Sequence, residues 1–183
     1  MSDSAIIVAE LSVPAREAPA RAAATAAWLL AQGVIRPNER PDPLWRPSRY
    51  DPGPAASTAL ADRRTADRTV DGAIGDGIDI IDRRQIHDPG GNYTPPGCPR
   101  CAVPLDADTH TALILPWLDG DEPLVTCAHC GAAALLGDWS GHWAVLVSDL
   151  AVRFTNWPPL DDAFLHALQA HLGPRCRLIH HLL

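Results

Sequence analysis

The sequence predicts an α+β fold that carries a small metal-binding module near its middle. Short segments rich in isoleucine and valine alternate with two helical patterns, in the order strand, helix, strand on either side of the middle. Two Cys-x-x-Cys pairs, at residues 98–101 and 127–130, lie between the two halves. A chain of 183 residues is long enough for one compact domain with such a module.

The first half begins with a strand and a helix. Residues 5–13 are predicted to form a strand because isoleucine and valine are enriched there. An alanine-rich helix is predicted over residues 21–32. Pro19 suits its first turn, and Gly33 suits the position that follows its last turn.

The stretch from residue 34 to residue 71 is harder to interpret because prolines interrupt it repeatedly. Trp45 and Tyr50 lie among these prolines. Such aromatic residues usually fix a loop to the body of a protein, and a ligand groove is the alternative. Mixed arginine and aspartate residues over 55–71 predict a short exposed helix, and residues 77–83 predict a strand.

The second half repeats the order of the first. Residues 143–147 and 150–157 are predicted strands, joined by a tight turn at residues 148–149. Residues 160–172 give the clearest helical pattern, with one apolar stripe and acidic residues in the first turn. Residues 177–183 predict a final strand.

Without residues 96–140, these elements follow the order β-α-β, β-α-β, with one extra strand near the middle. This is the ferredoxin-like pattern. The sequence therefore predicts a core domain built from residues 1–95 and 141–183. Residues 96–140 are predicted to be an insertion that projects from one end of the sheet.

The two cysteine pairs predict a structural metal site. They comprise Cys98, Cys101, Cys127 and Cys130, and 25 residues separate them. Four thiolates satisfy tetrahedral Zn²⁺ and leave no open position for water or substrate. The pattern therefore predicts one zinc ion per chain that stabilises structure and performs no chemistry.

Residues 96–140 resemble a zinc ribbon, with CPRC before one hairpin and CAHCG before another. Pro99 and Gly131 are typical of such knuckles, whereas Ala102 stands where the first knuckle usually has glycine. The resemblance covers about a quarter of the chain and implies a fold and a metal, but no activity. Two disulfides, or four ordinary buried thiols, are the alternatives.

The fifth cysteine, Cys176, is interpreted as a small buried apolar residue, although Arg175 and Arg177 on either side would also suit a reactive thiol.

The charge distribution favours a protein partner over nucleic acid. The formal charge is −7, and four thiolates with one zinc ion would lower it to about −9. Residues 95–141 contain six acidic residues against Arg100 alone. Such a surface repels phosphate and suits a partner protein with a basic surface, and solvated surface charge is the simpler alternative.

The composition also excludes several classes of protein. The chain has no lysine, so it has no P-loop lysine and no Schiff-base lysine. The chain contains no run of about 18 apolar residues, so no membrane span is predicted. The acidic N-terminal stretch is unlike a secretory signal. A bacterial cytoplasmic protein is the resulting expectation, since a reducing compartment keeps thiols available for metal.

No catalytic motif is evident. The best general-base candidate is His87, which precedes Asp88 and a glycine-rich turn. A second metal site built from His87, His142 and the pair at residues 180–181 is a further alternative. The leading hypothesis is therefore a non-enzymatic, zinc-stabilised protein-binding module of the adaptor, inhibitor or immunity type. The alternatives are a nucleic-acid-binding or transcription-related zinc-ribbon protein, and an enzyme with a site around His87 and the Trp45/Tyr50 loop.

Overall fold

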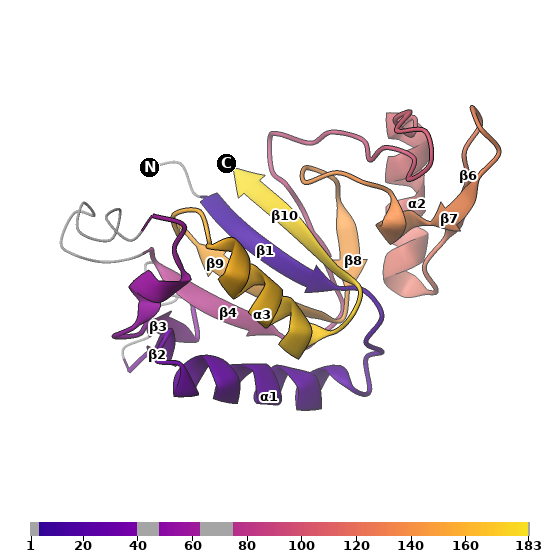
Figure 1. The fold of residues 1–183 in the computed structure, drawn as a ribbon. Coiled ribbons are helices and arrows are strands. Elements are labelled where there is room, and N and C mark those ends of the chain that lie inside the picture. Colours follow the sequence, from indigo (N-terminus) through magenta and orange to yellow (C-terminus); the bar gives the residue numbers. More distant parts are fainter. Residues whose placement is uncertain (1–3, 40–47, 63–74, 183) are drawn as a thin grey trace.

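A computed structural model describes residues 4–39, 48–62 and 75–182. The fold is a mixed α/β arrangement with three α-helices and a sheet of six strands (Figure 1). In spatial order the strands are β10 (Cys176–Leu182), β1 (Ser4–Glu10), β9 (Leu150–Thr155), β4 (Gly77–Ile81), β3 (Tyr50–Pro52) and β2 (Ile35–Pro37). Every neighbouring pair in this sheet is antiparallel.

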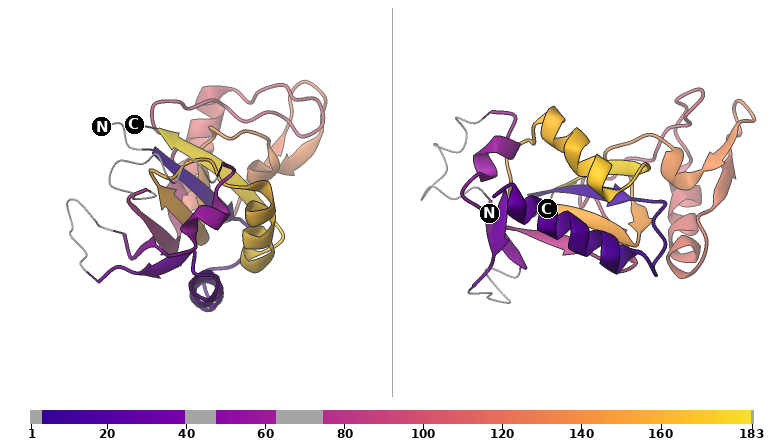
Figure 2. Two further views of the ribbon diagram at one scale, coloured as in Figure 1. Left: turned by 60° about the vertical axis from the view of Figure 1, so that its left-hand side comes forward. Right: turned by 60° about the horizontal axis from the view of Figure 1, so that its bottom comes forward.

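Two helices cover one face of the sheet. They are α1 (Ala18–Ala31) and α3 (Asp162–Leu172), which pack against each other and against the central strands (Figure 2). The side chains between them form the helix-side core, which includes Ile6, Val8, Leu29, Val152, Phe154 and Leu168. As predicted, Pro19 lies in the first turn of α1, and Gly33 adopts a left-handed φ of 68° just after its end.

The cysteine-bearing segment, residues 96–140, lies toward the opposite face of the sheet. It contains α2 (Ala107–Asp119) and a hairpin of β6 (Leu124–Thr126) and β7 (Ala133–Leu135). A second pair, β5 (Gln85–His87) and β8 (Leu146–Ser148), connects this segment to the sheet. The shared cysteine-side core includes Ile7, Ala9, Trp117, Leu136, Trp139 and Ile179.

The two cores explain the sequence of β1. Its residues alternate between the faces, with Ile6 and Val8 in the helix-side core and Ile7 and Ala9 in the cysteine-side core. Because both faces are covered, the strand is an unbroken apolar run and does not alternate between apolar and polar residues. The strand is shorter than predicted, because the Glu10 carboxylate accepts hydrogen bonds from the backbone N–H groups of Ser12 and Val13 and turns the chain.

Several predicted elements differ from the structure. The proline-interrupted stretch contributes the two short edge strands β2 and β3, and Tyr50 lies in β3, whereas Trp45 lies outside the described residues. Of the helix predicted over residues 55–71, the described part forms only a 3₁₀ turn at Ala56–Ala59. Both of these alanines are buried, so this part is not the exposed helix that was predicted.

The predicted hairpin at residues 148–149 is wrong. The strands β8 and β9 belong to different sheets, and the Asp149 side chain between them is buried and bonded to Arg84. The helix α2 was not predicted at all, because residues 102–126 were interpreted as part of two hairpins. Within the described ranges, no helix is both long and apolar enough to cross a membrane.

Candidate metal centre

The four predicted cysteines lie together. The sulfur atoms of Cys98, Cys101, Cys127 and Cys130 are all within 4.8 Å of one another. The Sγ atoms are 3.7 Å apart in the pair Cys98–Cys130 and also in the pair Cys101–Cys127. A tetrahedron with Zn–S bonds of about 2.3 Å has edges of about 3.8 Å, whereas a disulfide needs about 2.0 Å. The separation therefore fits a tetrahedral metal ion such as zinc and does not fit disulfides.

The two knuckles have the same backbone geometry. In the first, the Ala102 N–H donates to the Cys98 carbonyl at 2.8 Å, and the Cys98 N–H donates to the Val103 carbonyl at 2.9 Å. In the second, the Gly131 N–H and the Cys127 N–H make the equivalent bonds at 2.9 and 2.8 Å. Each knuckle needs a left-handed residue after its second cysteine, so Ala102 has a φ of 59° and Gly131 a φ of 71°.

The electrostatics of the cluster favour a bound cation. Burial opposes ionisation of Cys98, but hydrogen bonds from the backbone amides of Arg100 and Cys101 lower its pKa to about 6. The pKa of Cys101 is raised to about 12, because burial and the neighbouring sulfurs outweigh a backbone hydrogen bond from Val103. Four thiols at this separation cannot all ionise unless a cation compensates their charge, and a divalent metal supplies that compensation.

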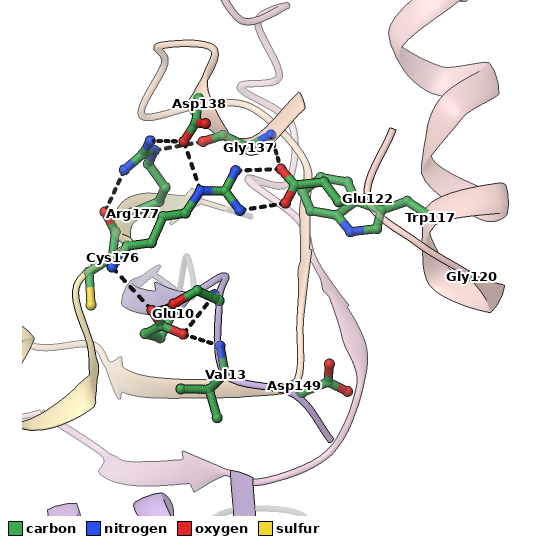
Figure 3. Close-up of polar contacts among 12 residues, drawn as sticks. Glu10, Val13, Trp117, Gly120, Glu122, Gly137, Asp138, Asp149, Cys176 and Arg177 are labelled. Atoms are coloured by element: carbon green, nitrogen blue, oxygen red, sulfur yellow. Dashed lines mark hydrogen bonds and ion pairs between the residues drawn. The ribbon is translucent and has the colours of Figure 1, made fainter. Parts of the chain in front are cut away.

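A half-buried ion-pair network joins the cysteine-bearing segment to the sheet (Figure 3). Arg175, which directly precedes β10, binds both carboxylate oxygens of Glu122 at 2.5 and 2.7 Å, and its Nε donates to Asp138 at 2.8 Å. Arg177 donates to the same Asp138 oxygen at 2.7 Å and to the Gly137 carbonyl at 2.6 Å. The pKa of Arg175 is raised, chiefly by its hydrogen bonds to Glu122, so this side chain remains charged.

A third arginine, Arg84, caps the C-terminal end of α2. The guanidinium of Arg84 donates to the carbonyl groups of Trp117 and Leu118 at 2.6 and 2.9 Å, and also to that of Gly120. These carbonyls have no partner within the helix, so Arg84 acts as a side-chain cap. Its third nitrogen binds the Asp149 carboxylate at 2.8 Å. Together with Arg175, it ties residues 96–140 to the core at two points.

The sequence analysis missed this network. Glu10 was not singled out, Glu122 was counted only among the acidic residues of 95–141, and Arg175 was considered only as a neighbour of Cys176, because charged residues far apart in the sequence give no local pattern. One signal was available, since Glu10 interrupts a run of apolar residues that predicts a strand. Its carboxylate accepts hydrogen bonds from Ser12, Val13 and the Arg175 backbone. Trp117 and Trp139 form part of the cysteine-side core.

The structure does not support His87 as a general base. Its side chain is only 2% exposed, and its Nε2 lies 2.8 Å from the Ser148 hydroxyl, which itself donates to the Leu150 carbonyl. Burial, reinforced by the charge of Arg153, lowers its pKa to about 4. His87 is therefore a neutral, buried structural residue that donates to Ser148.

The remaining alternatives also fail to form sites. Among the described residues, the four cysteines are the only group of three or more potential ligands close enough to share a metal ion, so His87, His142, His180 and His181 do not form a second centre. Cys176 is half-buried, and desolvation, with a smaller contribution from Glu10, raises its pKa to about 12. This thiol therefore stays protonated, as expected for a small packed residue.

The depressed pKa of His87 predicts that this residue destabilises the fold in acid. Its pKa is about 4 in the folded protein against 6.5 in the unfolded chain, so the unfolded chain binds more protons between these values. Stability should fall as the pH drops through this window, by up to about 3 kcal/mol from this residue.

Urea unfolding at pH 7 and pH 4.5 should therefore show a larger loss of unfolding free energy for the wild type than for His87→Gln. The amide of glutamine can donate to Ser148 without titrating, and because the thiolates titrate in both proteins, only the difference between the two is informative. Equal losses would contradict the prediction.

Comparison with known proteins gives no relative. No family model matches the chain, and no curated protein and no solved structure matches it significantly.

Proposed function

We propose that this protein is a non-enzymatic binding protein, in which a structural zinc ion holds residues 96–140 in a form that contacts a partner protein with a basic surface. One observation carries the proposal. The two most exposed large apolar side chains in the described ranges, Leu115 (64%) and Leu124 (69%), both belong to this acidic segment. Apolar anchors beside charged residues are the usual composition of a protein-binding surface.

The placement of the charges supports this surface. On α2, Asp108, Leu115 and Asp119 are exposed and share one face, because they are seven and four residues apart. Asp119 and Asp121 have no ion pair within the described part of the chain, whereas Glu122 and Asp138 are engaged by Arg175. The uncompensated carboxylates therefore lie on the outer side of the segment and would attract lysine or arginine.

We also propose that the fold is a ferredoxin-like core with an inserted zinc ribbon. The order β10-β1-β9-β4, with α1 after β1 and α3 after β9, supports a ferredoxin-like core. The paired knuckles and the β6–β7 hairpin support a zinc ribbon inserted between β5 and β8. In this ribbon α2 separates the knuckles, and the four cysteines suit zinc because tetrahedral thiolate sites select it.

The alternative functions have weaker support. A nucleic-acid-binding surface would need a basic face, and the exposed side of residues 96–140 is acidic. An enzyme site at His87 would need an accessible imidazole, and this one is buried.

The test is affinity capture from the lysate of the native host, followed by native mass spectrometry. The immobilised wild-type protein should retain a partner in stoichiometric amount, and the yield should fall at high salt. The double variant Leu115→Ser/Leu124→Ser should lose this partner. Leu30→Ser is the matched control, because Leu30 on α1 is also exposed, at 39%. Retention of the partner by the double variant would refute this surface, and the absence of any salt-sensitive partner would refute the proposed function.

A further inference from the structure

Within the described residues, the outer edge of the sheet is unpaired along the second half of β4. The neighbouring strand β3 pairs with β4 only between Tyr50 and Ile78. Ser48 and Arg49 do not continue the ladder, because the Ser48 hydroxyl and the Arg49 N–H both bind the Asp79 carboxylate at 2.9 Å. From Ile80 to Asp82, no strand in the described part of the chain lies beside this edge. Such an edge presents unpaired backbone donors and acceptors.

Two pockets flank this edge, one on each face of the sheet. The helix-side pocket has a volume of about 240 Å³ and is lined by Pro19, Ala22, Ala23 and Ala26 of α1 together with Tyr50. The arginine pocket has a volume of about 330 Å³ and is lined by Arg49, Asp79, Arg83, Gln85 and Arg153. Both pockets include Ile80 and Asp82, so they open on either side of the same stretch of backbone.

The two pockets differ in chemistry. In the helix-side pocket, the methyl groups of α1 and the side chain of Ile80 lie beside Arg49 and Asp82, so the pocket suits a side chain with an apolar body. In the arginine pocket, Arg153 extends from the central strand β9 directly opposite Asp79. The Asp79 carboxylate already accepts bonds from Ser48 and Arg49, and the half-buried Arg153 has no ion pair or hydrogen bond within the described residues. A half-buried guanidinium without a partner favours a carboxylate ligand.

We propose that the free edge of β4 binds an extended peptide segment of a partner protein as an added strand. The backbone of the segment pairs with residues 80–82. One of its side chains enters the helix-side pocket as an apolar anchor, and the adjacent side chain, an aspartate or glutamate, binds Arg153 in the arginine pocket. Successive side chains of a strand point to opposite faces, so a segment with alternating apolar and acidic residues satisfies both pockets.

This surface is separate from the one proposed for the basic partner. It uses none of the residues on α2 or β6, and it attracts the opposite charge. Failure of either proposal therefore leaves the other intact.

The test is selection from a phage-displayed library of random nine-residue peptides, on the zinc-loaded protein. The enriched peptides should alternate apolar and acidic residues, and the peptide of highest affinity is then synthesised. Arg153→Glu should weaken its binding at least about tenfold, equivalent to about 1.4 kcal/mol. Ala23→Leu, which fills the helix-side pocket from an exposed position, should weaken it as well. Arg16→Glu is the matched control for charge, because its side chain is 81% exposed and lines neither pocket.

Hydrogen exchange then distinguishes strand addition from other modes of binding. The amides of residues 80–82 should exchange more slowly only when the peptide is bound, because a new ladder protects them. The proposal is overturned if no peptide is enriched over the Arg153→Glu protein or if the enriched peptides lack acidic residues. It is also overturned if the peptide slows amide exchange at other residues and not at 80–82. It is also overturned if sedimentation shows that a second copy of the chain occupies the edge.

Discussion

Removal of the metal ion is expected to destabilise both cores and not only residues 96–140. Trp117, Leu136 and Trp139 share one core with Ile7 and Ile179 of the sheet, so loss of the cysteine-bearing segment exposes much of one face of the central strands. The binding free energy of a structural zinc ion is folding free energy, and in small zinc modules it reaches about 10–16 kcal/mol. That is comparable to the entire stability of a typical domain, about 5–15 kcal/mol.

The measurement is thermal unfolding by circular dichroism and calorimetry, with and without a chelator. Cys98→Ser and Cys127→Ser should reproduce the effect of the chelator, and Cys176→Ser should leave the transition close to that of the wild type because its sulfur lies outside the cluster. Metal analysis should give one zinc per chain. A sheet that retains its transition temperature after chelation would contradict this prediction, because the segment would then fold independently of the core.

Replacement of Arg175 by alanine is expected to cost about 2–4 kcal/mol of stability, because it leaves the largely buried Glu122 carboxylate without its partner, a situation between a fully buried and an exposed ion pair. The side chain of Arg175 is 19% exposed and that of Glu122 is 12% exposed. Without the guanidinium, Glu122 keeps only its bond from the Gly137 N–H among the described residues. Lysine should not restore stability, since an ammonium group cannot make the paired contacts with Glu122 and Asp138 at the same time.

Chemical denaturation of matched variants measures this cost. Arg16→Ala is the control, because its ion pair with Glu17 is exposed, at 81% and 55%, and such pairs contribute little. The double variant Arg175→Met/Glu122→Leu should recover most of the lost stability, since it removes both charges together. A loss below about 1 kcal/mol for Arg175→Ala would mean that the network does not hold the segment to the sheet.

The parts of the fold that could be predicted are those whose pattern is local. The strands β1, β4, β9 and β10 are dense in isoleucine, valine or leucine, and α1 and α3 have glycine at their ends. The edge strands β2 and β3 have only three residues each and contain prolines, so their pairing depends on the sheet beside them. For α2, Pro116 in its last turn obscured the pattern, although Asp106 was an available signal, because its carboxylate accepts the Thr109 N–H at 2.9 Å as an N-cap.

In the candidate site too, the parts that could be predicted are those with a local sequence pattern. The spacing of the four cysteines predicted that they lie together, because each knuckle is a local structure of four residues. The contacts that hold the knuckles to the sheet join Glu10, Glu122 and Arg175, which no local pattern connects. The pockets at β4 were not predictable either, since they depend on where β3 stops pairing with it.

The position of β1 has a consequence for the order in which the chain folds. Both neighbours of β1 come much later in the sequence, with Ser4 opposite Leu182 on one side and Ala5 opposite Thr155 on the other. During synthesis β1 therefore cannot form its pairs in this sheet until β9 and β10 have been made. Contacts of such long sequence separation slow folding and prolong the exposure of apolar strands. The six residues from Ala5 to Glu10, all buried in the final sheet, are thus expected to need protection by a chaperone until β9 and β10 have left the ribosome.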